Sequence, residues 1–410
     1  MAGITTAPAD IGAARAGDSP ARWGAVYAMA LCSFVLVASE FMPISLLSPI
    51  ARTLQLTEGQ AGQAIAISGV FAVAMSLSLS SLLGRLDRRI VLLALTALLA
   101  VSGAIVAAAP TYWIFMAGRA LLGIAIGGFW SMSAAVAMRL VPAAAVPKAL
   151  AVINGGNALA TLVAAPLGSF LGSLIGWRGA FFCVVPVAVL AILWQALTLP
   201  RMPIAERQTA KAMFALLRRP PLLFGLMTVA LLFVGQFSLF TYLRPFLEQI
   251  TRVDASMLSI MLLVLGVSGF VGTVLIGRVL NRGLYATLTA LPAIMAVTAV
   301  GLTVFGTSAG ATLVLLAVWG FAGTSAPVAW WTWLARTVPD EAEAGGGVMV
   351  AIVQLAITLG ATVGGAVFDM AGARAEFLTS AALLGLAAIA AFTIGRGHGK
   401  PKALGRTIAA

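Results

Sequence analysis

Long apolar stretches follow one another along nearly the whole chain, and this pattern limits the folds available to it. A helix needs about 20 mostly apolar residues to cross about 30 Å of hydrocarbon. Only 9% of the 410 residues are charged, against the roughly 25% that is typical of soluble domains. We therefore predict an all-α polytopic membrane protein with twelve transmembrane helices, at residues 24–47, 62–84, 90–109, 111–139, 147–175, 180–199, 221–243, 256–279, 284–306, 309–335, 345–370 and 376–395.

Short motifs recur at a nearly constant spacing, which indicates an internal duplication. "GRLDRR" (84–89) and "GRVLNR" (277–282) lie 193 positions apart. "AAPLGSFLG" (164–172) and "GATVGGAVF" (360–368) lie about 196 positions apart. Weak similarity at a fixed offset is typical of a duplicated half. We therefore predict two pseudo-symmetric six-helix bundles in this order of segments: a disordered cytoplasmic tail at 1–22, a bundle at 23–199, a cytoplasmic loop at 200–220, a second bundle at 221–395 and a cytoplasmic tail at 396–410.

The net charge of +12 is divided unevenly between the two sides of the predicted membrane. With the N-terminus inside, 19 basic residues fall on the cytoplasmic side and five fall outside. An excess of Lys and Arg in cytoplasmic segments sets the orientation of membrane proteins. The pattern therefore predicts that both termini are cytoplasmic. It also explains the basic charge without a nucleic-acid partner, and we expect no cleavable signal peptide.

One carboxylate and one guanidinium are expected deep in the membrane. Glu40 lies in "LVASEFMPIS" (36–45) of the first helix, and Arg119 lies in the fourth helix. At about 1.5 Å per residue, both fall in the outer-middle part of the bilayer. A charge buried there needs a partner, and each is the other's candidate. Glu40 is the only acidic residue that we expect deep in any span.

Two interpretations of this pair remain open. One is a static ion pair that locks the first helix to the fourth. The other is a carboxyl group that titrates, because burial and a nearby cation shift a carboxyl pKa in opposite directions and access to water then switches its protonation. In the second case Glu40 couples proton movement to conformational change, and Arg119 modulates it.

Polar and aromatic side chains within the spans are candidates for a substrate pocket. Aromatic rings and amides together suit a flat heterocycle, which they bind by stacking and hydrogen bonds. The polar side chains are equally suited to hydrogen bonds between helices, and Trp rings also gather at membrane surfaces. The candidates are Asn157, Gln236, Tyr242, Gln354, Trp130 and Trp330.

Small residues four positions apart predict close approach of helices. Gly123 and Gly127 have this spacing in the fourth helix, and Gly360 and Gly364 have it in the eleventh. The spacing is compatible with static packing and with an interface that moves.

The combinations that enzymes need are missing from the sequence. No glycine loop followed by Lys is present to bind phosphates, so direct use of ATP is not expected. The one histidine, His398, lies in the C-terminal tail, and the two cysteines, Cys32 and Cys183, lie in apolar stretches. We therefore predict that the protein is not an enzyme and has no catalytic residue, metal site or cofactor.

Three stretches resemble motifs of the proton-coupled drug antiporter family of the major facilitator superfamily: "RALLGIAIGG" (119–128), "APLGSFLGSLIGWRGAF" (165–181) and "GRLDRR" (84–89). The resemblance covers essentially the whole chain. It implies the major facilitator fold, alternating access between the two bundles and a role for Arg119 in proton coupling.

The same resemblance implies roles in gating or packing for residues outside the deep pair. Asp87 and Arg88 lie in the loop motif after the second helix. Pro166 and Gly168 lie in the antiporter motif of the fifth helix.

Four further stretches are similar to bacterial pumps that export purine ribonucleosides: "EFMPISLLSPIA", "EGQAGQ", "GGFWSMSAAVAMRLVPAAAVPKAL" and "GQFSLFTYLRPF". This similarity implies a monomeric proton antiporter of a bacterial inner membrane, whose partners are protons, the bilayer and nucleosides such as inosine and guanosine. It also implies that Glu40 is the site of protonation. An exporter of drugs or sugars on the same fold remains an alternative, as do an intramembrane enzyme and a sensor without transport.

Overall fold

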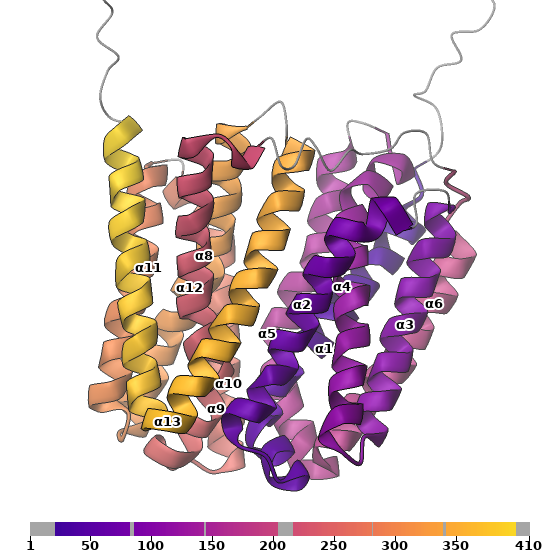
Figure 1. Ribbon diagram of the computed structural model, residues 1–410. Helices are drawn as coiled ribbons and strands as arrows, with labels where there is room; N and C mark the ends of the chain where they lie inside the picture. The colour runs from indigo at the N-terminus through magenta and orange to yellow at the C-terminus, as the bar shows by residue number, and fades with distance from the viewer. Residues whose placement is uncertain are drawn as a thin grey trace, which may run out of the picture.

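The computed structural model describes residues 21–82, 86–142, 145–203, 216–280, 282–338 and 342–398, and the regular structure in these ranges is helical (Figure 1). The predicted tails and central loop fall largely outside them, at residues 1–20, 204–215 and 399–410. Within the described ranges, ten stretches are long and apolar enough to cross a membrane. The elements are α1 (Trp23–Leu54), α2 (Glu58–Leu82), α3 (Arg88–Ala108), α4 (Tyr112–Leu140), α5 (Val146–Phe182), α6 (Val184–Thr198), α8 (Pro220–Thr241), α9 (Leu243–Phe246), the π-helix η2 (Leu247–Thr251), α10 (Ala255–Leu280), α11 (Leu284–Phe305), α12 (Ala309–Thr337) and α13 (Ala342–His398).

Two of the ten stretches, Lys148–Thr198 and Gly345–Arg396, each contain a sharp break at a glycine. Gly176 has φ 73° and ψ 166°, and Gly372 has φ 82° and ψ 173°. A positive φ is rarely adopted by residues with a Cβ, so glycine makes this turn without strain. The two glycines lie 196 positions apart, which is the predicted repeat offset. With each broken stretch counted as two helices, the twelve predicted helices are accounted for, and the predicted fold class is confirmed.

The helices form two bundles that stand side by side (Figure 1). Helices α1 to α6 pack on one another in the first bundle, and α8 to α13 pack in the second. The main contacts between the bundles join α2 to α13 and α5 to α10. The start of α1 and the end of α13 lie at the same end of the molecule, which we call the terminal end. The opposite end, where α13 reverses direction at Gly372, is called the far end.

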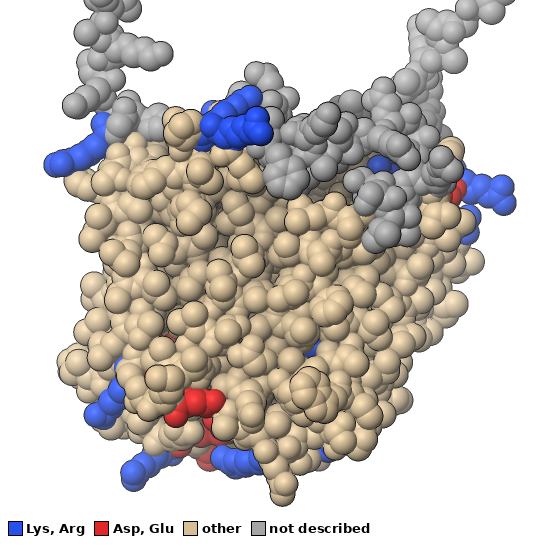
Figure 2. Space-filling view, viewed as in Figure 1, with Lys and Arg blue, Asp and Glu red and all other residues tan. Residues whose placement is uncertain are grey.

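The surface separates charged ends from an apolar belt (Figure 2). On the face shown, Lys and Arg side chains predominate at the terminal end, where acidic atoms are visible at the right edge, and side chains of both signs lie at the far end. The belt between them is nearly free of charge. Large apolar side chains such as Leu174, Val297 and Ile389 are more than half exposed. Exposed apolar surface on this scale fits a protein whose middle is surrounded by lipid.

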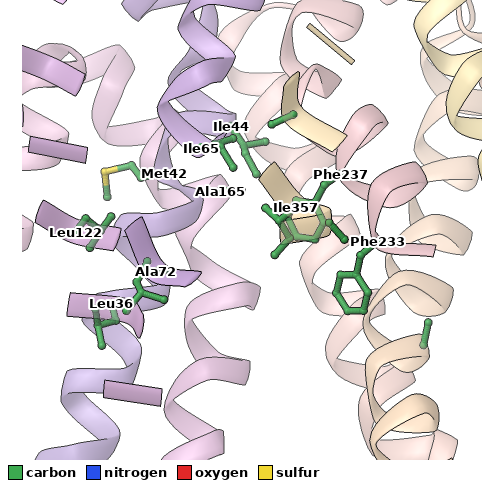
Figure 3. Packing of buried hydrophobic residues seen from close by; sticks show 14 of the residues in the cluster. Leu36, Met42, Ile44, Ile65, Ala72, Leu122, Ala165, Phe233, Phe237 and Ile357 are labelled. Carbon is green, nitrogen blue, oxygen red and sulfur yellow. The ribbon is translucent and has the colours of Figure 1, made fainter. Parts of the chain in front are cut away.

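Apolar side chains from both bundles fill the interior (Figure 3). In the second bundle Phe233 and Phe237 of α8 stack with ring centroids 6.2 Å apart, and Figure 3 shows Phe237 beside Ile357 of α13. Phe237 also packs against Phe41 of α1, so the two bundles meet through apolar side chains as well as through polar groups.

The predicted glycine lines, Gly123 with Gly127 on α4 and Gly360 with Gly364 on α13, lie inside the bundles. A Cβ at Gly123 would come within 2.2 Å of the carbonyl oxygen of Ser68 on α2. A Cβ at Gly360 would come within 2.6 Å of the carbonyl oxygen of Val234 on α8. Both approaches join helices of one bundle, so these lines serve packing within the bundles.

Candidate functional site

A proline in the middle of α1 leaves a backbone carbonyl without its helical donor. Pro43 has no N–H, so the carbonyl of Ser39, four residues earlier, lacks its usual hydrogen bond. Arg119 of α4 supplies the donor, with Nη1 2.7 Å from the Ser39 oxygen. Its Nη2 donates to the carbonyl of Glu40 at 3.1 Å, and its Nε donates to that of Ala64 on α2 at 2.9 Å. The buried guanidinium therefore joins three helices through their backbones.

The side chain of Glu40 is bonded to the other bundle. Gln354 of α13 donates from Nε2 to Glu40 Oε1 at 3.3 Å, and both side chains are buried. Among the described residues, Glu40 and Arg119 make no salt bridge at 4.0 Å or less. The static ion-pair interpretation therefore lacks its contact, because Arg119 is bonded to carbonyls and the Glu40 carboxyl group to a neutral amide.

An aromatic group lies next to this polar contact. The ring centroid of Phe41 is 5.7 Å from that of Phe237 and 6.3 Å from that of Phe240, both on α8. Phe41 and Phe237 lie 196 positions apart, so the pair joins equivalent positions of the two repeats. These rings offer flat apolar faces between the bundles, one residue from Glu40.

A second proline of α1 creates the same defect nearer the far end. Pro49 frees the carbonyl of Ser45, and the donor here is Arg244 of α9, in the other bundle. Arg244 Nε is held by Glu248 Oε1 at 2.8 Å. The second Glu248 oxygen accepts a weaker contact from the exposed Arg52 at 3.4 Å. This network closes the bundles against each other at the far end.

The N-terminus of α2 makes hydrogen bonds within its own bundle and donates others to the opposite bundle. Thr57 and Gln60 form a capping box, with the two backbone N–H groups donating to the opposite side chains at 3.0 Å each. Asp369 of α13 accepts from Gly59 N at 3.0 Å and from Thr57 Oγ1 at 2.6 Å. A carboxylate is favourable at this place because the helix dipole and free N–H groups face it. The cap therefore adds a second link between the bundles at the far end.

The predicted polar pocket residues do not form one cluster. Asn157 is half-buried on α5 and makes no hydrogen bond to Gln354. Gln236 donates to the carbonyl of Gly323 at 3.2 Å, within the second bundle. Tyr242 is fully buried and donates to a backbone carbonyl of α13 at 2.8 Å. Of these residues, the structure brings Gln354 into contact with Glu40.

The two predicted tryptophans have different surroundings. Trp130 is half-buried and packs with Phe34 and Phe41 around a small apolar cluster of α1 and α5. Trp330 is buried in the second bundle, with its ring centroid 5.3 Å from that of Trp333. The structure therefore places Trp130 close to the aromatic group beside Glu40 and Trp330 in the core of one bundle.

The residues assigned to gating or packing make contacts within the first bundle and with the start of the loop that follows it. Asp87 caps α3 and accepts from Met202 N at 2.9 Å, and Arg88 N donates to the Met202 carbonyl at 3.2 Å. Pro166 lies inside α5, and Gly168 packs against α1. Among the described residues, no group of three or more His, Cys, Asp or Glu side chains is arranged to hold a metal ion.

A second buried carboxylate lies in the other bundle. Glu376 of α13 has no exposed surface and accepts a hydrogen bond from Ser238 Oγ at 2.6 Å. Its other oxygen has no hydrogen-bond donor among the described residues. Glu376 is therefore a second acidic side chain that is shielded from solvent, close to the turn at Gly372. Glu376 is the first residue of the predicted twelfth helix, where a carboxylate would ordinarily reach water, but the tight turn at Gly372 leaves it packed against α8.

The fold and the polar contact between two helical bundles are those of a secondary transporter. Residues 29–356 match the sequence profile of the Major Facilitator Superfamily, and the chain belongs to this superfamily. The chain is 39% identical over 373 residues to "Purine ribonucleoside efflux pump NepI" of Salmonella paratyphi B, covering 91% of this chain and 94% of that one. The resemblance to these pumps is therefore confirmed, and the comparisons point to a transporter and not to an enzyme.

A second relative is named as a regulatory protein and not as a pump. The chain is 58% identical over 370 residues to "Transcription regulatory protein OpdE" of Pseudomonas aeruginosa, covering 89% of this chain and 92% of that one. Among solved structures, a bacterial homologue of the human lysosomal transporter Spinster superposes with a TM-score of 0.75 at 16% identity, over 93% of this chain and 98% of that one. A mutant of the nucleoside transporter NupG superposes with a TM-score of 0.73 at 16% identity, over 90% and 98%. These superpositions support the same fold.

Proposed function

We propose that this protein exports purine ribonucleosides, such as inosine and guanosine, and purine analogues in exchange for protons. It acts as a monomer in a bacterial inner membrane, with its terminal end in the cytoplasm. The two bundles expose a central site to either side in turn, and the far-end contacts break when the site opens outward. Glu40 takes up a proton from outside and releases it inside, and Arg119 lies beside it as the modulating charge.

The main observation in support is the bonding of Glu40. Its buried carboxyl group contacts a neutral amide of the opposite bundle, while the nearby guanidinium is bonded to backbone carbonyls. Such a carboxyl group gains or loses a proton without breaking an ion pair. Because its partner is on the other bundle, each change of charge acts on the interface that must open and close.

The nucleoside assignment is supported by similarity and by chemistry. The relatives at 39% identity bear the name of a purine ribonucleoside efflux pump. The aromatic pair of Phe41 and Phe237, with the amide of Gln354 nearby, offers the stacking and hydrogen bonds that suit a flat base. An exporter of drugs or sugars would use the same scaffold with other pocket contacts.

Uptake of radiolabelled inosine into inverted membrane vesicles that are acid inside tests the proposal. We expect uptake by the wild type. In Glu40→Gln we expect gradient-driven uptake to fall by at least about tenfold, while exchange of inosine without a gradient persists. Glu376→Gln is the matched control, because it makes the same substitution at the other buried carboxylate, and its uptake should stay within about twofold of wild type.

Two outcomes would overturn this assignment. Full gradient-driven uptake by Glu40→Gln would eliminate Glu40 as the proton carrier. Absence of inosine flux in the wild type would eliminate the nucleoside exporter and leave two alternatives, an exporter of drugs or sugars and a sensor without transport. The name of the relative at 58% identity is the observation that keeps the sensor in view.

A further inference from the structure

Gln354 connects Glu40 to the second bundle. Its Nε2 donates to Glu40 Oε1 at 3.3 Å, the side chain is 7% exposed, and its Oε1 has no hydrogen-bond donor among the described residues. One helical turn further on, Thr358 donates to the carbonyl of Ala66 on α2 at 3.2 Å, which fixes this part of α13 to the first bundle. A buried acceptor without a donor is uncommon in proteins and points to a ligand or to a second state of the site.

The two protonation states of Glu40 need opposite partners. An ionised carboxylate only accepts hydrogen bonds, whereas a protonated carboxyl group also donates one. The amide of Gln354 has a donor end and an acceptor end of nearly the same shape, so a half-turn about its last bond exchanges them. With Glu40 ionised, Nε2 is used and Oε1 is left as an acceptor. With Glu40 protonated, Oε1 accepts the carboxyl proton and the NH₂ group is left as a donor.

We propose that this exchange is the step that couples protons to substrate, with Gln354 presenting a different hydrogen-bonding group to the nucleoside in each protonation state of Glu40. The inference rests on the proposed function and extends it to one residue and one class of base. When Glu40 is ionised, Oε1 accepts the N1–H of a 6-oxopurine, the base of inosine and guanosine. When Glu40 takes up a proton from outside, the amide of Gln354 turns and its NH₂ group faces the N1–H of the base. Because two donors cannot form a hydrogen bond with each other, the nucleoside is released. Loss of the proton inside restores the acceptor.

The surroundings of Glu40 favour the amide as the coupling group. The charged side chain beside Glu40 is Arg119 of α4, which donates to the backbone carbonyls of Ser39, Glu40 and Ala64 and keeps these bonds in both protonation states of this scheme. From α13, Glu40 is faced by the neutral Gln354. The charge of Arg119 therefore stays within the first bundle, and the change in hydrogen bonding is passed to the second bundle through Gln354.

The pH dependence of inosine binding to the purified full-length protein tests this inference. In the wild type we expect affinity for inosine to fall by about tenfold or more from mildly alkaline to mildly acidic pH, the equivalent of about one buried hydrogen bond. Gln354→Met keeps the length of the side chain but has no amide. We expect it to bind inosine more weakly at alkaline pH, with affinity that no longer changes with pH.

A second readout concerns the base. Adenosine lacks N1–H, so the wild type should prefer inosine over adenosine by about tenfold in competition at alkaline pH. Gln354→Met should lose this preference. Retention of either the wild-type pH profile or the wild-type preference in this variant would overturn the inference.

Matched variants separate coupling from general damage. Gln63→Met removes another amide contact between α2 and α13, since Gln63 Oε1 accepts from Thr362 Oγ1 at 3.3 Å, and it should keep the wild-type pH profile. Gln354→Asn retains an amide that is one methylene too short to reach Glu40, and it should show the same flat profile as Gln354→Met. It replaces the methionine variant if that protein does not fold. If the wild type binds and transports no inosine, the proposed function fails. If it does both while the Gln354 variants behave as wild type, only the present inference fails.

Discussion

The two prolines of α1 create the same local defect, and the protein uses it in two ways. Pro43 and Pro49 each free the carbonyl four residues earlier, and each freed carbonyl receives a guanidinium. At Pro43 the donor is Arg119 of the same bundle, and at Pro49 it is Arg244 of the other bundle. The first contact is therefore a fixed joint, whereas the second must break whenever the bundles separate at the far end. The bundle that supplies the cation therefore decides whether such a bond stabilises the fold or has to break during the movement.

The largest effect is expected from Arg119→Met. The substitution leaves the Ser39 carbonyl without a donor, at about 1–3 kcal/mol, and it also removes the hydrogen bonds from Arg119 to the carbonyls of Glu40 and Ala64, so the free energy of unfolding should fall by about 3–5 kcal/mol. Thermal unfolding in detergent measures the change. If this variant unfolds at the wild-type temperature, Arg119 is not a fixed joint.

Arg244→Met should leave the fold intact and loosen the far end. Because one charge-assisted bond between the bundles is lost, at about 1.5–3 kcal/mol, the outward-open population should rise by about tenfold or more. The measurement is the rate at which a thiol reagent labels Gln63→Cys, in a background without Cys32 and Cys183. A labelling rate equal to that of the parent would show that the contact does not hold the bundles together.

Restoring the backbone donor should rescue the first defect in part. Pro43→Ala gives α1 an N–H for the Ser39 carbonyl, so it should recover about 1 kcal/mol of stability in the Arg119→Met background beyond its effect in the wild type. A double-mutant cycle of unfolding temperatures isolates this coupling. Strict additivity of the two substitutions would show that Arg119 does not replace the donor that Pro43 removes.

The smallest effect is expected from Pro49→Ala. Its new N–H competes with Arg244 for the Ser45 carbonyl, so labelling of Gln63→Cys should rise by about two- to threefold. In the Arg244→Met background the same proline substitution should have no further effect on labelling. A further rise there would mean that Pro49 acts on the far end by another route.

The helices and their repeat are predictable from sequence because they depend on local composition. Apolar length alone located the spans, and the offset of about 196 between the repeated motifs also separates Gly176 from Gly372. The sequence also identified Glu40 and Arg119 as unusual, because charges within apolar stretches are rare. These inferences need no knowledge of which helices touch.

The partners of the buried charges depend on contacts between distant parts of the chain, and sequence reasoning did not reach them. Glu40 and Gln354 are 314 positions apart, and their hydrogen bond follows from the way α1 meets α13. The role of Arg119 could have been inferred from Pro43, because a proline within a helix leaves the carbonyl four residues earlier without its donor. Glu376 was missed because the burial of a residue near a helix start depends on the neighbour that covers it, here α8 with Ser238.

The two glycine turns have a consequence for handling the protein. Because the chain is helical on both sides of Gly176 and Gly372, these reversals leave hardly any loop at the far end. The connections at residues 55–57, 109–111 and 306–308 are also short. Proteases cut at exposed, mobile loop tips. A protease added outside sealed liposomes should therefore not cut molecules whose far end faces outward. The fraction of uncut protein then measures how many copies were inserted with the far end outward.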